Sequence, residues 1–430
     1  MKTRTDEECD VARVSLAEAR KAQRSWALQT ISARLRLIRG LRHLIAAHAP
    51  ELAAAAAAVK ERPVAEKLAS EVLPLADACR WLERRAVRVL APRRCGKEDR
   101  PFWMRGISFE VQRQPFGVVL VIAPANYPLF LPAVQTLHAL IAGNAVLLKP
   151  APGTLHVASV FSKFIRVAGL GHGLLTILPV NVASAGAAIA EGVDKVIFTG
   201  SSENGRDVLR QLASQNTPAV MELSGKDAVL VFGDADLDLV IRALRFGTRW
   251  NGGETCIAPR RLFVVEALAD DLCTRLSQTG LALLPFERVP DEAAATGRAM
   301  ATNFALGVSI FSRDVSKART FAARIKSGFV LINDLIVPTA DPRMPFGGVK
   351  ASGFGVTRGD EGLLEMTFPH VVAVREGKSR PHLDELGTDA ACLFSSYILA
   401  AHGKGQRRIG ALRDLIGTLI SETRNKKPLK

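Results

Sequence analysis

Residues 118–124 read VVLVIAP, an unbroken apolar run that ends at a proline. Such a run is typical of a strand buried on both faces, as the strands of parallel sheets are. Further short apolar runs predict strands at 145–150 (AVLLKP), 174–180 (LLTILPV) and 195–201 (KVIFTGS). Amphipathic segments between and after these runs predict helices near 131–143, 155–168, 183–191 and 203–214. Strict alternation of strands and helices predicts right-handed βαβ units and a parallel sheet.

The flanking segments extend this pattern. Residues 11–95 are expected to be helical, because apolar side chains recur at helical spacing in runs such as 32–48. After the first sheet, strands are expected at 218–223 and 227–232, a long helix near 236–250, mixed strands and helices over 282–375, and a strand near 370. The predicted fold class is therefore α/β.

Length and composition set the outer limits. A chain of 430 residues that is 48% apolar predicts a globular protein of about two or three domains. We expect no transmembrane segment and no secretory signal, because no long apolar run occurs and the start carries both signs of charge. The six cysteines form no CxxC pair, so neither a metal site nor a disulfide scaffold is expected. These features predict a cytoplasmic protein.

The net charge of +15 is high, but its distribution is not that of a nucleic-acid-binding protein. Lysine and arginine are spread along the chain, and no basic motif with interleaved aromatic residues occurs, so no nucleic-acid partner is expected. Only the tail is densely basic. There, residues 407–420 predict an amphipathic helix with Ile409, Leu412, Ile416, Leu419 and Ile420 on one face. This helix could dock on the body of the protein or lie on a membrane surface or partner.

Residues that directly follow the predicted strands are candidates for function, because ligands of open parallel sheets bind at the carboxyl ends of the strands. Asn126, Lys149, and the Gly200–Ser201 pair occupy such positions. Cys256 stands in a loop that follows Gly252 and Gly253. Glycines permit close approach of backbone amides to a ligand, so this thiol is a candidate nucleophile for attack on a carbonyl group.

Several motifs together resemble the aldehyde dehydrogenase superfamily, in the family's order. They are PANYP (124–128), LLKP (147–150), FTGSSENGR (198–206), MELSGKDAVLVFGDADLD (221–238), NGGETCIAPRR (251–261) and PFGGVKASGFG (345–355). The resemblance covers most of 110–375. It implies a Rossmann-type cofactor domain, an α/β catalytic domain and a small β oligomerisation element.

The resemblance also implies roles for single residues. Cys256 would add to an aldehyde to form a thiohemiacetal, Asn126 would hold the oxyanion, and Glu222 would activate water to hydrolyse the resulting thioester. The cofactor would be NADP or NAD. Residues that match the family's cofactor contacts are Lys149, Gly200, Ser201, Pro124 and Gly225. No metal is implied.

The chain departs from the family in three places. Several dozen residues are missing near 274–282, including a Glu-x-Phe motif that holds the nicotinamide ribose in the family. In KPAPGT (149–154), Pro152 stands where relatives that prefer NAD carry a glutamate. Because no carboxylate then repels a 2′-phosphate, we expect NADP to be accepted. The basic tail beyond 376 is not a usual family feature.

The expected organisation follows from these matches. A cofactor domain is expected at 1–107 and 117–223, a reduced catalytic domain at 224–360, an oligomerisation element at 108–116 with 361–378, and a basic extension at 379–430. The exposed strands of the oligomerisation element predict a homodimer or homotetramer. Apart from other copies of the same chain, the only expected binding partner is a small-molecule aldehyde as the substrate.

Two other functions remain open at this stage. One is a catalytically impaired homologue that acts as a binding or assembly protein, which the shortened catalytic domain would explain. The other is acyl transfer to coenzyme A, although an intact Glu222 favours hydrolysis. The aldehyde pocket is expected near 127–135, 247–257 and 335–345, with Tyr127, Phe130, Trp250 and Phe304 as candidate lining residues. Arg260 or Arg261 would either attract an acidic substrate or support the nucleophile loop.

Overall fold

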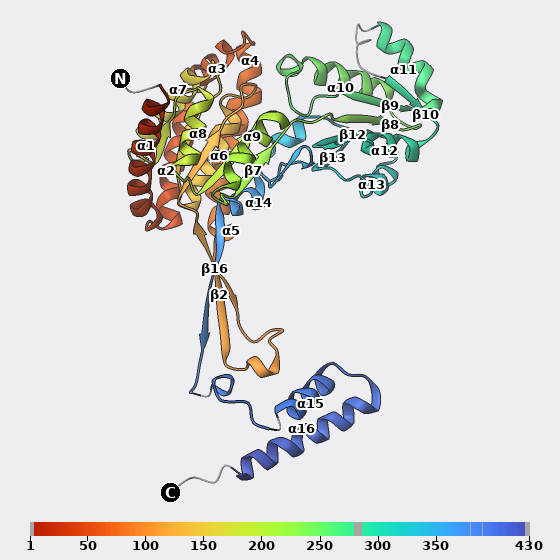
Figure 1. The fold of residues 1–430 in the computed structure, drawn as a ribbon. Helices are drawn as coiled ribbons and strands as arrows, with labels where there is room; N and C mark the ends of the chain where they lie inside the picture. The colour runs from red at the N-terminus through yellow and green to blue at the C-terminus, as the bar shows by residue number, and fades with distance from the viewer. Residues whose placement is uncertain (1–3, 279–285, 379, 389, 426–430) are drawn as a thin grey trace. The chain divides into compact units, whose positions relative to one another are not determined.

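The computed structural model describes residues 4–278, 286–378, 380–388 and 390–425 (Figure 1). The chain divides into two compact units. The first comprises 1–95 and 109–372, and the second comprises 96–108 and 373–430. Each unit is described by itself.

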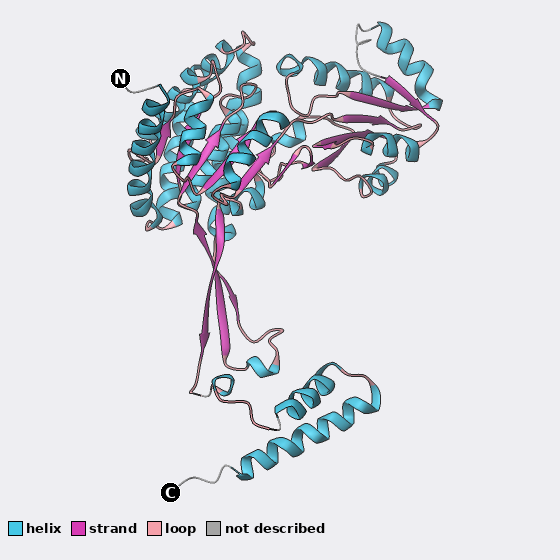
Figure 2. Ribbon diagram, in the orientation of Figure 1, coloured by secondary structure: helices cyan, strands magenta, loops and turns pink. Residues whose placement is uncertain are grey.

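A six-stranded sheet forms one half of the first unit, in the order β15-β7-β6-β3-β4-β5 (Figure 2). Its strands are β3 (Val118–Ile122), β4 (Ala145–Lys149), β5 (Leu175–Ile177), β6 (Lys195–Thr199), β7 (Ala219–Glu222) and β15 (Gly353–Phe354). All pairs are parallel except β15 with β7. Every residue of β3 and β4 is buried, as their continuous apolar runs predict.

Helices cover this sheet and share one hydrophobic core with it. They are α1 (Arg4–Ala27), α2 (Ile31–Ala47), α3 (Ala49–Ala58), α4 (Val64–Lys67), α5 (Leu73–Val89), α6 (Phe130–Ala142), α7 (Leu155–Val167), α8 (Val182–Ala190) and α9 (Ser202–Ala213), with a π-helical turn, η1 (Leu68–Val72), before α5. Helix α6 is buried along its whole length because α2 and α5 pack over it. The expected alternation of strands and helices over 118–214 is confirmed.

A five-stranded, fully parallel sheet forms the other half, in the order β10-β9-β8-β12-β13. Its strands are β8 (Ala228–Val231), β9 (Arg261–Val265), β10 (Phe286–Val289), β12 (Gly307–Phe311) and β13 (Phe329–Ile332). Helices α10 (Leu237–Arg249), α11 (Glu266–Gln278), α12 (Glu292–Met300) and α13 (Val315–Ala322) connect them. Separate apolar clusters lie on the two faces of this sheet, so it is buried between two layers.

Further short elements lie between these helices and strands along the chain. They are β11 (Phe304–Ala305), β14 (Val349–Lys350), α14 (Gly359–Leu364), and the 3₁₀ turns η3 (Trp250–Gly253) and η4 (Val337–Ala340). Strand β15, which follows the second sheet in the chain, pairs with β7 of the first sheet, and α14 packs on α5 and α6. The segment 345–364 therefore returns from the second sheet to the first.

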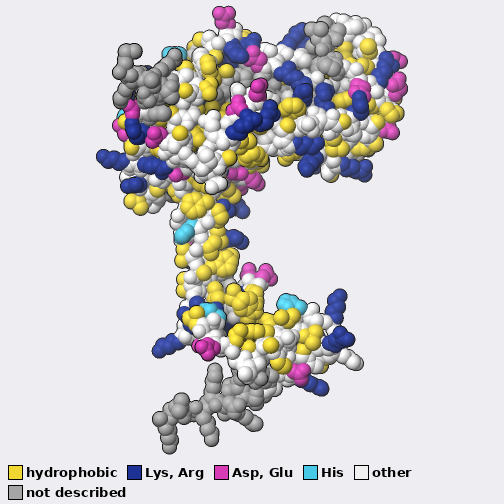
Figure 3. Space-filling model, in the orientation of Figure 1, with side chains coloured by type: hydrophobic (Ala, Val, Ile, Leu, Met, Phe, Trp, Pro, Cys, Tyr) yellow, Lys and Arg dark blue, Asp and Glu magenta, His cyan; other side chains and the backbone are white. Residues whose placement is uncertain are grey.

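A three-stranded sheet of β1 (Arg93–Cys95), β2 (Ile107–Pro115) and β16 (Thr367–Arg375) lies outside these cores. The second unit contains the 3₁₀ turns η2 (Phe102–Met104) and η5 (Pro381–Leu383), and the helices α15 (Ala390–His402) and α16 (Gly405–Asn425), which pack on one another. The expected tail helix is confirmed, and Ile409, Leu412 and Ile416 on it are exposed. Figure 3 shows hydrophobic side chains at the surface of this unit. The side chains of Leu419 and Ile420 lie outside the described residues. No helix in the described part of the chain is long and apolar enough to cross a membrane.

Candidate active site

A cavity of about 770 Å³ opens at the carboxyl ends of β3, β4, β6 and β7. The cavity also receives side chains from the second sheet's loops, among them the segments around Trp250 and Ile336. It contains every site residue expected from the sequence except one: Cys256, Glu222, Asn126, Lys149, Gly200, Pro124 and Gly225. The exception is Ser201, which does not line the cavity. Sequence positions that are far apart therefore converge on one place, as the parallel topology predicts.

The position of Cys256 is set by the end of helix α10 and by the turn that follows it. Asp236 caps the start of α10, and the helix ends at Arg249. The following turn places Asn251, Gly252 and Gly253 in succession at positive φ, and this reverses the chain toward the cavity. Burial, together with the nearby Asp227 and Glu222 carboxylates, raises the pKa of the Cys256 thiol to about 12. The resting thiol is therefore protonated.

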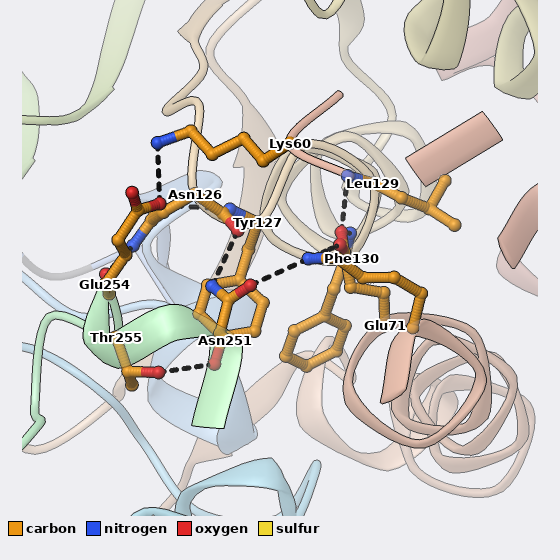
Figure 4. Close-up of polar contacts among 10 residues, drawn as sticks. Lys60, Glu71, Asn126, Tyr127, Leu129, Phe130, Asn251, Glu254 and Thr255 are labelled. Carbon is orange, nitrogen blue, oxygen red and sulfur yellow. Dashed lines mark hydrogen bonds and ion pairs between the residues drawn. The ribbon is translucent and has the colours of Figure 1, made fainter. Parts of the chain in front are cut away.

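Asn126 lies beside the nucleophile loop and is tied to it by several hydrogen bonds (Figure 4). Its side-chain Nδ2 donates to the Glu254 carbonyl at 2.8 Å, and its own carbonyl accepts from Asn251 Nδ2 at 2.9 Å. The hydroxyls of Tyr127 and Thr255 are hydrogen-bonded at 2.8 Å. A side-chain amide carries two N–H donors, so one donor of Asn126 is available to a ligand beside Cys256.

A buried ionic network adjoins this loop, and Figure 4 labels Glu71, Leu129, Phe130 and Asn251 of it. Lys67 and Glu71 are 2% and 0% exposed, and their charged atoms lie 2.9 Å apart. Lys67 Nζ also donates to Asn251 Oδ1 at 2.9 Å, while Glu71 Oε2 accepts the backbone N–H groups of Leu129 and Phe130 at 2.7 and 3.1 Å. Glu71 thus satisfies free donors at the start of α6. The network joins the π-helical turn, α6 and the nucleophile loop.

Glu222 ends β7 and is buried, with hydrogen bonds to both carboxylate oxygens. Thr357 Oγ1 donates to Oε1, and Oε2 accepts from Thr199 Oγ1 at 3.1 Å and from Gln135 Nε2 at 3.4 Å. Burial raises the pKa of Glu222, and the threonine hydroxyls and the nearby Arg358 guanidinium oppose this shift. A carboxyl with a raised pKa in a cavity is suited to accept a proton.

Lys149 and the start of α9 could hold a dinucleotide in this cavity. Lys149 is 6% exposed, burial lowers its pKa, and its amino group has no hydrogen bond or ion pair among the described residues. Such a group needs a polar partner, which ribose hydroxyls would supply. Gly200 lies at the start of α9, whose N-terminus favours an anion. Ser201 is instead the N-cap of α9, and its hydroxyl accepts from Asn204 N at 3.2 Å. Gly225 has no room for a side chain, since a Cβ there would lie 3.0 Å from the Cys256 carbonyl oxygen.

The side chains expected to line the aldehyde pocket are only in part found in the wall of the cavity. Tyr127, Phe130 and Trp250 line the cavity, but Phe304 does not. Phe304 lies in β11, where it pairs with Lys350 of β14. Arg260 donates to the Gly253 carbonyl at 2.7 Å, so it supports the nucleophile loop.

Arg261 stabilises the segments next to the nucleophile loop through hydrogen bonds to their backbone. It donates to the backbone carbonyls of Lys226 and Ala299 at 2.9 Å each. The hydrogen bonds of Arg260 and Arg261 are therefore those expected for support of the nucleophile loop and its surroundings.

Several residues of the site carry no sequence signal of their own. Lys67 and Glu71 have the spacing of an ordinary surface pair, and Gln135 and Thr357 stand in apolar or glycine-rich segments. Arg358 also lines the cavity. Only the π-helical turn that contains Glu71 marks its segment as unusual, since such turns are frequent at functional sites.

Comparison with known proteins agrees with this architecture. The model of the aldehyde dehydrogenase family matches residues 2–283 and 281–372. The chain belongs to the aldehyde dehydrogenase family. It is 29% identical over 374 residues to 4,4'-diapolycopene aldehyde oxidase of a Methylomonas species, covering 71% of this chain and 70% of that protein. It is also 29% identical over 347 residues to the succinate-semialdehyde dehydrogenase [NADP(+)] of Deinococcus radiodurans, covering 63% of this chain and 72% of that protein.

Among solved structures, the NAD-dependent aldehyde dehydrogenase of Sinorhizobium meliloti superposes with a TM-score of 0.81 at 25% identity, covering 87% of this chain and 89% of that one. Family members that use NAD and members that use NADP are thus both similar to this chain. The family match is divided into two pieces that meet at 281–283. This division coincides with the expected loss near 274–282, of which 279–282 lie outside the described residues.

Proposed function

We propose that the protein oxidises an aldehyde to a carboxylic acid with NAD⁺ or NADP⁺, using Cys256 as the nucleophile. The observation that carries this proposal is the single cavity that Cys256, Glu222 and Asn126 share with Lys149 and Gly200. A nucleophile, an oxyanion donor, a base and a dinucleotide subsite are the parts that this reaction requires.

In the proposed reaction, the Cys256 thiol first loses its proton to the nearby Glu222 carboxylate, which passes it on to water. The thiolate then adds to the aldehyde carbon to give a thiohemiacetal. The second N–H of Asn126 Nδ2 and the N–H of Cys256 stabilise the oxyanion, and loss of one such donor costs about 100- to 1000-fold in rate. Bound NAD(P)⁺ supplies the hydride acceptor, and a thioester remains on Cys256. Glu222 then takes a proton from water, the hydroxyl adds to the thioester, and the acid leaves as the thiolate is restored.

Lys149 would hold the cofactor's adenosine ribose hydroxyls, and the start of α9 would hold its phosphates. Pro124 and Gly225 are proposed to contact the cofactor through the backbone. Ser201 does not line the cavity, so we propose that it acts only by ordering the start of α9.

We further propose that the protein is a homo-oligomer in the cytoplasm. Strand β16 is at the edge of its sheet and exposes Val371, Val372 and Val374, which favours pairing with another chain. Among the described residues, no group of three or more histidine, cysteine and acidic side chains is arranged to hold a metal ion.

Reduction of NADP⁺ and NAD⁺ with a panel of short, long and aromatic aldehydes tests the proposal. We expect turnover in the wild type and none in Cys256→Ala. The control Cys273→Ala, at an exposed cysteine of α11, should keep full activity. Glu222→Gln should still release one equivalent of reduced cofactor but turn over about 100- to 10,000-fold more slowly.

Absence of turnover in folded wild-type protein would refute the proposal and favour an impaired homologue that serves as a binding or assembly protein. Product formation that requires coenzyme A would favour acyl transfer instead.

A further inference from the structure

Arg358 is a buried cation in the wall of the cavity. It is 4% exposed and directly follows Thr357, which holds Glu222. Its Nη1 donates to the Thr339 carbonyl, whereas its Nε has no hydrogen-bond partner. No carboxylate among the described residues lies within ion-pair distance of the guanidinium. A guanidinium that stays charged is therefore buried with most of its donors unused.

This arrangement is unusual for the protein. The buried Lys67 is paired with Glu71, and the buried Lys195 lies 2.8 Å from Glu365. Burial of an unpaired charge is strongly unfavourable, and the usual remedy is an anionic partner. Arg34 also lacks an acidic partner, but it does not line the cavity. Among the described residues, Arg358 is thus a buried arginine that faces a space where a ligand can enter and has no carboxylate at ion-pair distance, although the Glu222 carboxylate acts on it electrostatically from farther away.

The surroundings of Arg358 belong to the aldehyde end of the cavity. Its guanidinium carbon lies 4.4 Å from the ring centroid of Phe346 and 5.6 Å from that of Phe130. Thr339, its hydrogen-bond partner, comes from one of the segments expected to line the aldehyde pocket. Lys149, the other buried cation with no partner, is instead assigned to the cofactor. Each end of the cavity therefore has its own unpaired positive charge.

We propose that Arg358 binds a carboxylate carried by the aldehyde substrate, so that the substrates are oxo acids with an aldehyde at one end and a carboxylate at the other. This inference rests on the proposed function. The guanidinium carbon lies over the rings of Phe346 and Phe130, and Nη1 is the nitrogen that donates to Thr339, so further N–H donors of the group remain for a carboxylate. The apolar side chains of the pocket would enclose the carbon chain between the two groups.

A different function for Arg358 makes a different prediction. The charge of the guanidinium also opposes the rise in the pKa of Cys256 and of Glu222. If this were its only function, loss of Arg358 would slow the oxidation of every aldehyde by the same factor. If it binds a substrate carboxylate, only acids would be affected.

The test compares kcat/KM for oxo acids of increasing chain length with kcat/KM for neutral aldehydes of equal length. We expect the wild type to prefer the best oxo acid by about 100-fold, because a neutral chain leaves the guanidinium unpaired. Arg358→Met should abolish this preference, mainly through a higher KM, and Arg358→Lys should restore part of it. Arg34→Met, at a buried arginine outside the cavity, should leave the preference unchanged.

Equal kcat/KM values of the wild type for neutral aldehydes and for oxo acids would overturn the inference. An Arg358→Met variant whose kcat/KM falls by the same factor for both kinds of substrate would overturn it too. Absence of all turnover would refute the proposed function instead. In that case, or if Arg358→Met does not fold, binding of glutarate and of its diamide to the wild type decides the matter. Preferential binding of glutarate that prevents alkylation of Cys256 supports the inference, and equal binding overturns it.

Discussion

The buried pair Lys67–Glu71 offers a strong test of the structure, since its removal should affect both stability and activity. The informative change is Lys67→Met, which keeps the length of the side chain and removes its charge. Glu71 would then remain fully buried with two backbone N–H donors and no cation. Asn251 would lose the hydrogen bond to Lys67, and with it part of the support for the Asn126 carbonyl.

The magnitude follows from the burial. Removal of one partner of a buried pair costs about 3–5 kcal/mol, because the other charge is left uncompensated. The pair Lys60–Glu254 is a matched control: its nitrogen and oxygen lie 2.6 Å apart, but its side chains are 39% and 37% exposed. Lys60→Met should therefore cost less than about 1 kcal/mol. The double variant Lys67→Met/Glu71→Leu should regain much of the lost stability, since it removes both charges.

Urea unfolding followed by circular dichroism measures these free energies, and aldehyde turnover measures the effect on the site. We expect kcat of Lys67→Met to fall about 10- to 100-fold below that of Lys60→Met, because a small displacement of a catalytic group has effects of this order. If Lys67→Met costs no more than Lys60→Met, or if the double variant is less stable than Lys67→Met, the pair is not buried as described.

Two further predictions concern the chemistry of the site. Burial raises the pKa of Cys256 to about 12, so its thiolate fraction should rise about tenfold per pH unit from pH 7 to 9. Its rate of alkylation by iodoacetamide without cofactor, followed by peptide mass spectrometry, should rise by the same factor. A plateau above pH 7 would contradict the prediction. Pro152 lines the cavity and carries no charge, so kcat/KM with NADP⁺ should equal or exceed kcat/KM with NAD⁺. The variant Pro152→Glu should shift this ratio toward NAD⁺. A clear preference of the wild type for NAD⁺ would refute the argument.

Much of the fold could be predicted because its strands are buried on both faces. Such strands must be apolar throughout, so β3, β4 and β6 are visible in the sequence as uninterrupted runs. Strand β15 has no comparable signal. It contains two residues in a glycine-rich segment, and its antiparallel pairing with β7 depends on a tertiary contact with a distant part of the chain. Local sequence patterns contain no information about such a contact.

The site could be predicted where a residue follows a strand or belongs to a motif, and not where its role depends on burial. Cys256, Asn126 and Lys149 are of the first kind. Lys67 and Glu71 are of the second: their spacing is that of an exposed helical pair, and only the packing of their segment against α3 and α6 removes them from water. Arg358 is likewise an ordinary residue of a polar run, TRGDE, until the structure places it inside the cavity.

The position of the divided family match predicts that the site tolerates the expected loss of residues near 274–282. The division lies between α11 and β10, and β10 is the edge strand of the second sheet. An edge strand has one neighbour, so a change in the connection to it leaves the central pairs β9–β8 and β8–β12 intact. Cys256 lies in the loop before β9, whose strand keeps both neighbours. The nucleophile loop is held in addition by hydrogen bonds to Lys67, Asn126 and Arg260, none of which comes from the edge of the sheet. We therefore expect the missing segment to weaken the contacts to the nicotinamide ribose without removing the support of the nucleophile.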